Sequence, residues 1–196
     1  AIARKFPAEI GTTIVKSISF QVGRVGSITP VAEFEPATIG GVIITHASIH
    51  NFDEIRRLDV REGDTVLIKR AGDVIPQIIS VDLDKRFKES LQVSVPTECP
   101  SCNGPLEREE SGAILRCISG LSCSAQKVQA IKHFVSRKAL NIEGLGEKII
   151  TQLVDKNKIE NASDLYLLKK DDLLILEGFG NKSADNLLNA IESSKS

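Results

Sequence analysis

The sequence predicts a multidomain chain in which a β-rich part precedes an α-helical part, with a small metal-binding module between them. Three observations support this order. All seven prolines lie at or before Pro105, the four cysteines gather within residues 99–123, and the last 91 residues are rich in helical patterns and contain no proline. Because proline breaks helices and is typical of turns and strand edges, its distribution marks the change of structure.

The β-rich part, residues 9–84, has the patterns of five strands and one helix. Along 12–22, the apolar residues Ile14, Ile18, Phe20 and Val22 fall on even positions, which is typical of a half-buried strand. A helix is expected at about 47–59, where Ile49, Phe52, Ile55 and Leu58 are spaced for one buried face. The further expected strands are 28–34, 39–45, 64–70 and 74–81. A helix between the third and fourth of five strands is the order of the oligonucleotide/oligosaccharide-binding barrel, the OB-fold.

A polar linker is expected over residues 85–98, and a cysteine module follows at 99–124. The spacing there is C-x2-C, fourteen residues, then C-x5-C, from Cys99, Cys102, Cys117 and Cys123. Four thiolates with no open position predict a closed, structural Zn²⁺ site. Two disulfides and a rubredoxin-like iron site are the alternatives. We expect His133, ten residues past the last cysteine, to be a surface or core residue rather than a ligand.

The helical part, 125–196, is interrupted by two similar loops. Residues 142–153 and 176–187 share five of twelve identities, centred on Ile142-Glu-Gly-Leu-Gly146 and Leu176-Glu-Gly-Phe-Gly180. This pattern between helices is the helix-hairpin-helix signature, in which glycines let the backbone approach a phosphate at a helix N-terminus. Gly144, Gly146, Gly178 and Gly180 are therefore candidate DNA contacts, with Lys148 and Lys182 in the following helical turns. The alternative is a simple helix C-cap and turn.

Composition limits the mode of binding. The net charge is −1, and the segments 1–90, 91–139 and 140–196 carry 0, +2 and −3, so nucleic-acid binding must depend on placed groups rather than bulk positive charge. Only seven Phe and one Tyr occur, which weighs against stacking of single-stranded bases. The sequence contains no run of about 18 apolar residues, so it predicts no membrane span. We expect a monomeric cytoplasmic protein.

Several short segments, together with the cysteines and the paired loops in this order, closely resemble the bacterial NAD-dependent DNA ligases over essentially all 196 residues. The segments are Ala3-Arg-Lys-Phe-Pro-Ala-Glu9, Gln21-Val-Gly-Arg-Val-Gly26, Thr29-Pro-Val-Ala32, His50-Asn-x-Asp-Glu-Ile55 and Arg70-Ala-Gly-Asp-Val-Ile-Pro76. The resemblance implies that residues 1–8 end a nucleotidyltransferase domain. It also implies an OB-fold, a four-cysteine zinc module and a helix-hairpin-helix domain with two of its usual four hairpins.

By the same resemblance, the whole enzyme seals nicks in duplex DNA. It transfers AMP from NAD to a lysine and then to the 5′-phosphate of the nick, with release of nicotinamide mononucleotide, and uses NAD and Mg²⁺. Lys5 is then the cofactor-binding lysine that contacts the adenylate phosphates. Arg24 and Arg70 meet the DNA near the nick, while Val74 and Ile75 form an apolar wedge in the minor groove, or otherwise belong to the barrel core. Val25 stands where the family usually has threonine.

The nucleophile motif Lys-x-Asp-Gly is absent from the sequence, so we assign no catalytic residue and expect this chain alone to be inactive. We expect it to be an internal portion of the enzyme, without a BRCT domain. Two other functions are considered: a non-enzymatic duplex-DNA-binding module of a repair protein, and a protein-interaction module built on the zinc site. The Lys5-Phe6-Pro7 segment argues against the first alternative, and the paired loops are unexplained by the second.

Overall fold

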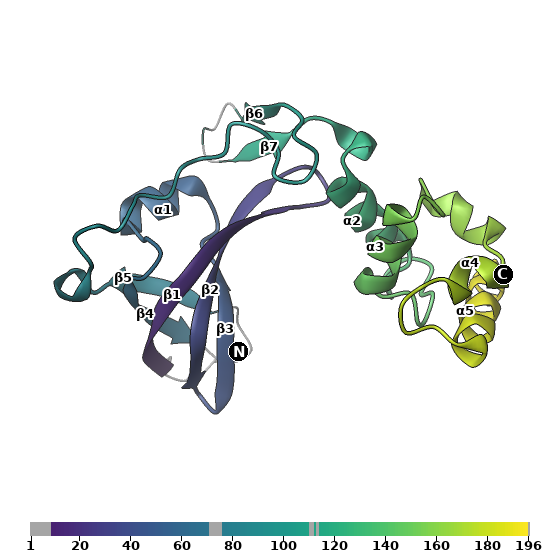
Figure 1. Cartoon of the computed structure of the whole chain (residues 1–196), viewed down its shortest axis with the longest axis horizontal. Coiled ribbons are helices and arrows are strands. Elements are labelled where there is room, and N and C mark those ends of the chain that lie inside the picture. The colour runs from purple at the N-terminus through teal and green to yellow at the C-terminus, as the bar shows by residue number, and fades with distance from the viewer. Residues whose placement is uncertain (1–8, 71–75, 110–111, 113, 196) are drawn as a thin grey trace, which may run out of the picture. The chain divides into compact units, whose positions relative to one another are not determined.

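The computed structural model describes residues 9–70, 76–109, 112 and 114–195, and these fall into two compact units (Figure 1). The first unit contains the described residues up to 22, then 27–100 and 106–116. The second contains 23–26, 101–105 and the described residues from 117 onward. Among the described residues, no helix is long and apolar enough to cross a membrane.

The first unit is built on an antiparallel five-stranded sheet with the order β3-β2-β1-β4-β5. Its elements are β1 (Glu9–Val22), β2 (Ile28–Ile39), β3 (Val42–Ser48), α1 (Phe52–Leu58), β4 (Thr65–Arg70), β5 (Gln77–Val81) and the short 3-10 helix η1 (Leu83–Lys85). The predicted order of five strands with a helix between the third and fourth is confirmed.

Strand β1 is shared between two halves of this sheet. Its residues Glu9 to Ile14 pair with β4, and its residues from Val15 to Val22 pair with β2. The register shifts between Val15 and Ser17, where the strand changes partners. A bulge bends a strand and increases its twist, and closing a sheet toward a barrel requires such a bend. The pairing therefore fits the OB-fold expectation.

Several element boundaries differ from the sequence prediction, most clearly those of β2, of β3, which is Val42–Ser48 rather than 39–45, and of α1. The expected break between residues 34 and 39 is wrong, because β2 runs without interruption from Ile28 to Ile39. Pro36 is accommodated where the β2–β3 register shifts between Glu33 and Ala37, since a bulge does not need its backbone donor. Helix α1 begins at Phe52 rather than near 47, because β3 continues to Ser48 and the Asn51 side chain caps the helix.

A buried ion cluster ties the chain after β5 to the barrel. Asp64 is completely buried and accepts hydrogen bonds from the Arg86 guanidinium at 2.8 and 2.9 Å and from the Arg61 backbone N–H at 2.8 Å. Arg86 also bonds Asp59, and this hydrogen bond, followed by one from Arg61, lowers the pKa of the Asp59 carboxyl. Arg61 Nη1 donates to the Ser90 carbonyl at 2.7 Å. Contacts with the barrel thus continue to Ser90, while the linker boundary at residue 85 stays a prediction.

The cysteine segment forms two short strands and leads into a helical unit. Its elements are β6 (Leu106–Arg108), β7 (Leu115–Cys117), the 3-10 helix η2 (Gly120–Ser122), and α2 (Ser124–Phe134). The remaining elements are α3 (Glu147–Asp155), the 3-10 helix η3 (Ala162–Leu167), α4 (Lys170–Leu174) and α5 (Asn181–Ser193). The helical segment has one break that the sequence did not predict, between α3 and α4, where Asn161 and Asp164 form a capping box.

One apolar core holds α2, α3, η3, α4 and α5 together. Each helix contributes a buried stripe, such as Ile150, Leu153 and Val154 of α3 and Ala184, Leu187 and Ile191 of α5. These positions repeat at helical spacing, so each helix buries one face and leaves the opposite face in solvent. The residues that open the two similar loops, Ile142 and Leu176, are also buried in this core. The core therefore fixes where each loop leaves the helical unit.

Candidate metal centre and nucleic-acid surface

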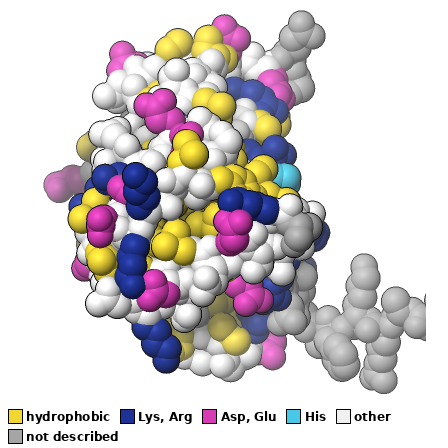
Figure 2. Space-filling model, turned by 90° about the vertical axis from the view of Figure 1, so that its right-hand side faces the viewer, with side chains coloured by type: hydrophobic (Ala, Val, Ile, Leu, Met, Phe, Trp, Pro, Cys, Tyr) yellow, Lys and Arg dark blue, Asp and Glu magenta, His cyan; other side chains and the backbone are white. Residues whose placement is uncertain are grey.

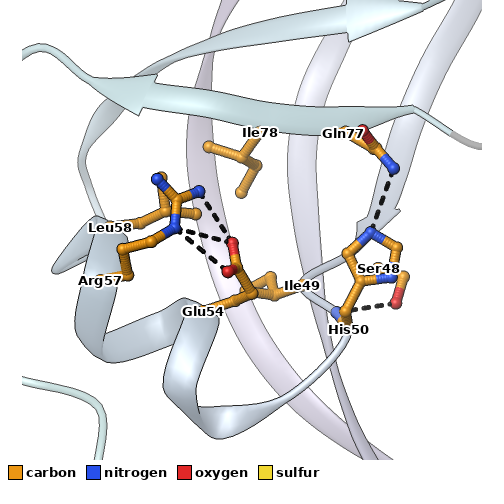
Figure 3. Close-up of a pocket in the computed structure, with 8 residues that line it drawn as sticks. All are labelled: Ser48, Ile49, His50, Glu54, Arg57, Leu58, Gln77 and Ile78. Carbon is orange, nitrogen blue, oxygen red and sulfur yellow. Dashed lines mark hydrogen bonds and ion pairs between the residues drawn. The ribbon is translucent and has the colours of Figure 1, made fainter.

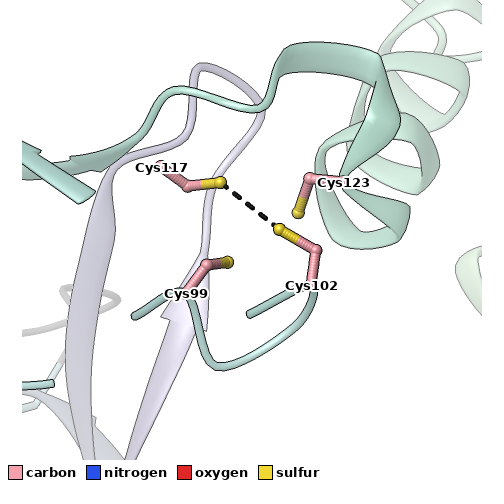
Figure 4. Close-up of side chains that lie close together, drawn as sticks. All are labelled: Cys99, Cys102, Cys117 and Cys123. Carbon is pink, nitrogen blue, oxygen red and sulfur yellow. Dashed lines mark hydrogen bonds between the residues drawn. The ribbon is translucent and has the colours of Figure 1, made fainter. Parts of the chain in front are cut away.

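The four cysteines come together as one cluster (Figure 4). Their sulfur atoms all lie within 4.8 Å of one another, and the Sγ atoms of Cys102 and Cys117 are 3.6 Å apart. Three of the four side chains are buried, and no disulfide joins any of these four cysteines. The separation is far beyond a disulfide bond of about 2.05 Å, so the two-disulfide alternative is wrong.

The sulfur positions fit a tetrahedral metal site. Zinc–sulfur bonds of about 2.3 Å place the four sulfurs about 3.8 Å from one another, close to the spacing found here. Four protein thiolates leave no coordination position for water or substrate, so the chemistry of the donor set is structural. His133 lies exposed in the last turn of α2, outside the cluster, as expected.

The local chain explains why these cysteines converge. The first pair is turned by Asn103, which has φ 54°, and by Gly104. A Cβ on Gly104 would lie 2.1 Å from Ser119 Oγ and 3.1 Å from Cys102 Sγ, so a larger residue there would require the Ser119 side chain to move. Cys117 ends β7, and Cys123 is the N-cap residue of α2. The cluster thus joins a tight knuckle, a strand end and a helix start.

The two similar loops have the same backbone design. Gly144 and Gly178 have φ angles of +83° and +81°, a conformation that favours glycine. Gly146 and Gly180 are the N-cap residues of α3 and α5, and both have an extended backbone. Neither glycine N-cap can supply a side-chain cap to the first N–H groups of its helix.

The four loop glycines face open space. Apart from its chain neighbours and its own helix backbone, a Cβ built on any of them would meet no atom of the described residues within 4 Å. At Gly146 and Gly180, therefore, neither internal packing nor a positive φ requires glycine. Inside each loop the central apolar residue is held inward: Leu145 is 5% exposed, and Phe179 packs partly buried against the core.

The two loops are also coupled to each other. The Gln152 side-chain carbonyl on α3 accepts a hydrogen bond from the Glu177 backbone N–H at 2.7 Å. Lys148 Nζ lies 3.9 Å from Glu177 Oε2 in an exposed ion pair. Sequence reasoning did not find Gln152, because nothing in its local pattern sets it apart from other polar helix positions. The contact fixes the second loop against the helix that follows the first.

The two arginines expected to contact DNA lie in different parts of the sequence and of the fold. Arg24 is exposed in the turn that follows β1. Arg70 ends β4 opposite Glu9, at the start of β1, and its Nη1 lies 3.4 Å from the Gly40 carbonyl. Lys5, Val74 and Ile75 lie outside the described residues. Arg24 thus follows the last residue of β1, whereas Arg70 pairs with its first.

The helical surface carries mixed charge. On the face shown in Figure 2, acidic and basic side chains alternate around exposed apolar ones, and its described residues form no large basic patch. This agrees with the net charge of −3 over residues 140–196. Any anion bound by this surface must be held by backbone N–H groups and a few placed cations.

A small polar pocket of about 130 Å³ lies between α1 and β5 (Figure 3). Glu54 and Arg57 form a close ion pair on one side, and the Arg57 hydrogen bond lowers the pKa of Glu54. On the other side His50, with φ 63°, lies 3.3 Å from the Gln77 side-chain nitrogen. Sequence analysis singled out His50 and Glu54 only as parts of a motif and missed the pocket.

Comparisons with known proteins agree with this geometry. Residues 12–90 match the model of the NAD-dependent DNA ligase OB-fold domain, and residues 98–125 match that of the NAD-dependent DNA ligase C4 zinc finger domain. A protein of Hahella chejuensis (strain KCTC 2396) named DNA ligase is 52% identical over 195 residues. The match covers 100% of this chain and 29% of that protein, so the chain spans less than a third of its relative. The C4 match identifies the cysteine cluster as a zinc site.

Proposed function

We propose that this chain, which belongs to the NAD-dependent DNA ligase family, is the part of such a ligase that grips nicked duplex DNA through its backbone. The whole enzyme would seal nicks by forming a phosphodiester bond coupled to cleavage of NAD, with Mg²⁺ as a further cofactor. The observation that carries the proposal is the pair of glycine loops, whose uncovered backbone lies at two helix N-termini.

We propose that these loops are helix-hairpin-helix motifs. Each would offer the backbone N–H groups of a first helical turn, and the positive end of the helix dipole, to the oxygens of one phosphate. Open space at Gly146 and Gly180 gives a phosphate room to approach the backbone. The Gln152–Glu177 hydrogen bond holds the loops at a fixed spacing, as two phosphates of a rigid duplex require. A flexible single strand would not need such a spacing.

Arg24 and Arg70 would add placed positive charge. Such arginines neutralise phosphates but do not read bases, so binding would have little sequence preference. Val74 and Ile75 are proposed as the apolar wedge and Lys5 as the lysine on the adenylate phosphates. The zinc ion supplies no reaction chemistry in a closed four-thiolate site; it holds the knuckle, β7 and the start of α2 together.

The non-enzymatic repair module is less favoured, because both domain models and the similar protein carry ligase names. The test of DNA binding is competition at fixed salt. A labelled nicked duplex bound to the zinc-loaded chain is challenged with unlabelled nicked duplex, intact duplex or single strand of equal length. We expect both duplexes to compete better than the single strand, with little dependence on sequence. Stronger competition by the single strand would overturn the proposal.

A second experiment tests where the chemistry lies. The chain is incubated with adenine-labelled NAD and Mg²⁺ and then run on a denaturing gel. We expect no covalent label, because the sequence has no Lys-x-Asp-Gly nucleophile. A labelled band would show that a lysine of this chain accepts AMP. A full-length family ligase serves as the positive control.

A further inference from the structure

A glutamine of helix α2 is buried beside the zinc site without being a ligand. Gln126 is 5% exposed, and it is one of three buried polar or charged residues among those described. Its side-chain nitrogen donates a hydrogen bond to the Cys117 carbonyl at 3.1 Å. Burying a polar side chain costs free energy unless it is bonded, so this contact accounts for its place there.

The same cysteine also holds a turn from the other end of the sequence. The Cys117 backbone N–H donates to the Gly26 carbonyl at 2.9 Å, so the peptide groups of Cys117 contact both Gln126 and Gly26. Gly26 closes the turn that starts at Gly23, through an N–H to carbonyl bond of 2.9 Å. Figure 4 shows this turn passing beside Cys117.

The packing around Gly26 is too close for a side chain. Gly26 has φ +82°, and a Cβ on it would lie 2.2 Å from the Cys117 carbonyl oxygen and 3.2 Å from Gln126 Oε1. Gly26 is buried, whereas Arg24, two residues earlier in the same turn, is exposed. In consequence, the turn Gly23–Gly26 groups with the second unit, although both strands that it joins belong to the first.

We propose that Gln126 is a positioning residue for DNA binding: through the Cys117 backbone it holds the turn Gly23–Gly26 in the place from which Arg24 reaches a phosphate. The DNA-binding role of Arg24 rests on the proposed function. The link from Gln126 through Cys117 to Gly26 does not, since it stands on the contacts alone. Cys117 is also a zinc ligand, so the metal that fixes its side chain fixes the turn as well.

Hydrogen exchange tests the link without DNA. Gln126→Leu keeps the volume but leaves the buried Cys117 carbonyl without its donor. We expect this variant to keep one zinc per chain while the Cys117 and Gly26 amides exchange about tenfold faster or more. Gln129→Leu, one turn along the same helix and bonded to Glu147 instead, is the matched control and leaves both amides protected. Unchanged protection in Gln126→Leu would overturn the proposal.

Gly26→Ala provides a second route if Gln126→Leu loses its zinc. Its Cβ must push the turn away from the Cys117 carbonyl, while no cysteine is altered. We expect zinc to be retained and the two amides to lose protection, as with Gln126→Leu. If Gly26→Ala keeps full protection of the Cys117 amide, the turn is not held by this contact, and the proposal fails.

DNA binding is then measured for both variants with Arg24 present and with Arg24→Gln. We expect Gln126→Leu to weaken binding to a nicked duplex only when Arg24 is present. The loss of affinity should be no larger than the loss caused by Arg24→Gln. The slope of log affinity against log salt should fall by up to about one. An equal loss in both backgrounds would mean a structural role and would overturn positioning. If the starting chain binds no DNA, the proposed function fails, and hydrogen exchange alone decides the link.

Discussion

Gly180→Ser separates phosphate binding from folding at the second loop. Gly180 has φ −115° and ψ 178°, which suits serine at an N-cap, and its Cβ would meet no atom within 4 Å. The serine hydroxyl can accept from the N–H of Lys182 or Ser183 in the first turn of α5. Serine caps are better than glycine by a few tenths of a kcal/mol, so the substitution should leave the fold unchanged or slightly more stable.

The same substitution should weaken DNA binding. A Cβ and a hydroxyl would occupy the open space that a phosphate needs, and the new cap would use an N–H that the phosphate would accept from. Losing one hydrogen bond to a charged partner costs about 1.5–3 kcal/mol, so affinity should fall at least about tenfold. Urea unfolding and anisotropy with a nicked duplex measure the two effects on the same preparation.

Two companion variants complete this test. Gly180→Ala adds the Cβ without a hydroxyl and should also lose affinity for DNA. Because alanine cannot donate a hydrogen bond to a phosphate, this variant measures the effect of the Cβ without any serine–phosphate bond that could compensate for it. Gly178→Ala places a Cβ at φ +81° and should instead destabilise the fold by about 1 kcal/mol. Full-strength binding by both Gly180 variants would refute the reasoning, and the loops would then be helix connectors only.

Three further predictions concern the metal, the barrel and acid. Elemental analysis should find one zinc per chain, and chelation should unfold the cysteine module, because metal binding supplies its folding energy; a folded, metal-free chain would contradict this. Arg70→Gln should reduce the slope of log affinity against log salt by about 0.9, as measured by anisotropy from low to moderate salt; an unchanged slope would remove Arg70 from the contacts. The pKa of Asp59 is lowered in the fold, chiefly by Arg86, so its stabilisation is complete above its ordinary value of 3.8 and is lost as the pH falls through the lower folded pKa. The stability difference between the original chain and Asp59→Asn should therefore shrink in acid, and a constant difference in urea midpoints would contradict it.

Local patterns in the sequence predicted the elements well where periodicity or spacing is strong. Alternation along residues 12–22 predicted strand β1, and the cysteine spacing predicted the metal cluster. The predicted buried face is wrong at Ile14, which is exposed while Val15 is buried, next to the register shift between Val15 and Ser17.

The prediction failed between residues 34 and 39, where a break was expected but β2 continues and the sheet accommodates Pro36 at a register shift. It also failed at the start of α1, where a helix was expected from about residue 47 although β3 continues to Ser48. In both places neighbouring strands overrode the local preference.

Local sequence patterns did not predict the ionic and polar contacts between residues that are far apart in the sequence. Asp64 reads as an ordinary turn acid beside Gly63, but it is completely buried because Arg86 returns to it from beyond β5. Similarly, His50 and Glu54 have no local signal that would predict a pocket with Gln77. Each of these contacts depends on which elements pack together. The local sequence around each residue does not show which distant element will pack against it.

The sequence by itself determined the order of the parts, the identity of the metal ligands and the two glycine loops, because spacing and periodicity are local properties of the chain. Only the tertiary structure decided that Gly26 and Cys117, 91 positions apart, share a hydrogen bond and that Gln126 donates to the carbonyl of the same Cys117. It also decided that Gly146 and Gly180 face open space rather than a crowded interior. The physical reason is the same for both: burial and hydrogen-bond partners are set by the packing of distant segments, and they exist only once the chain has folded.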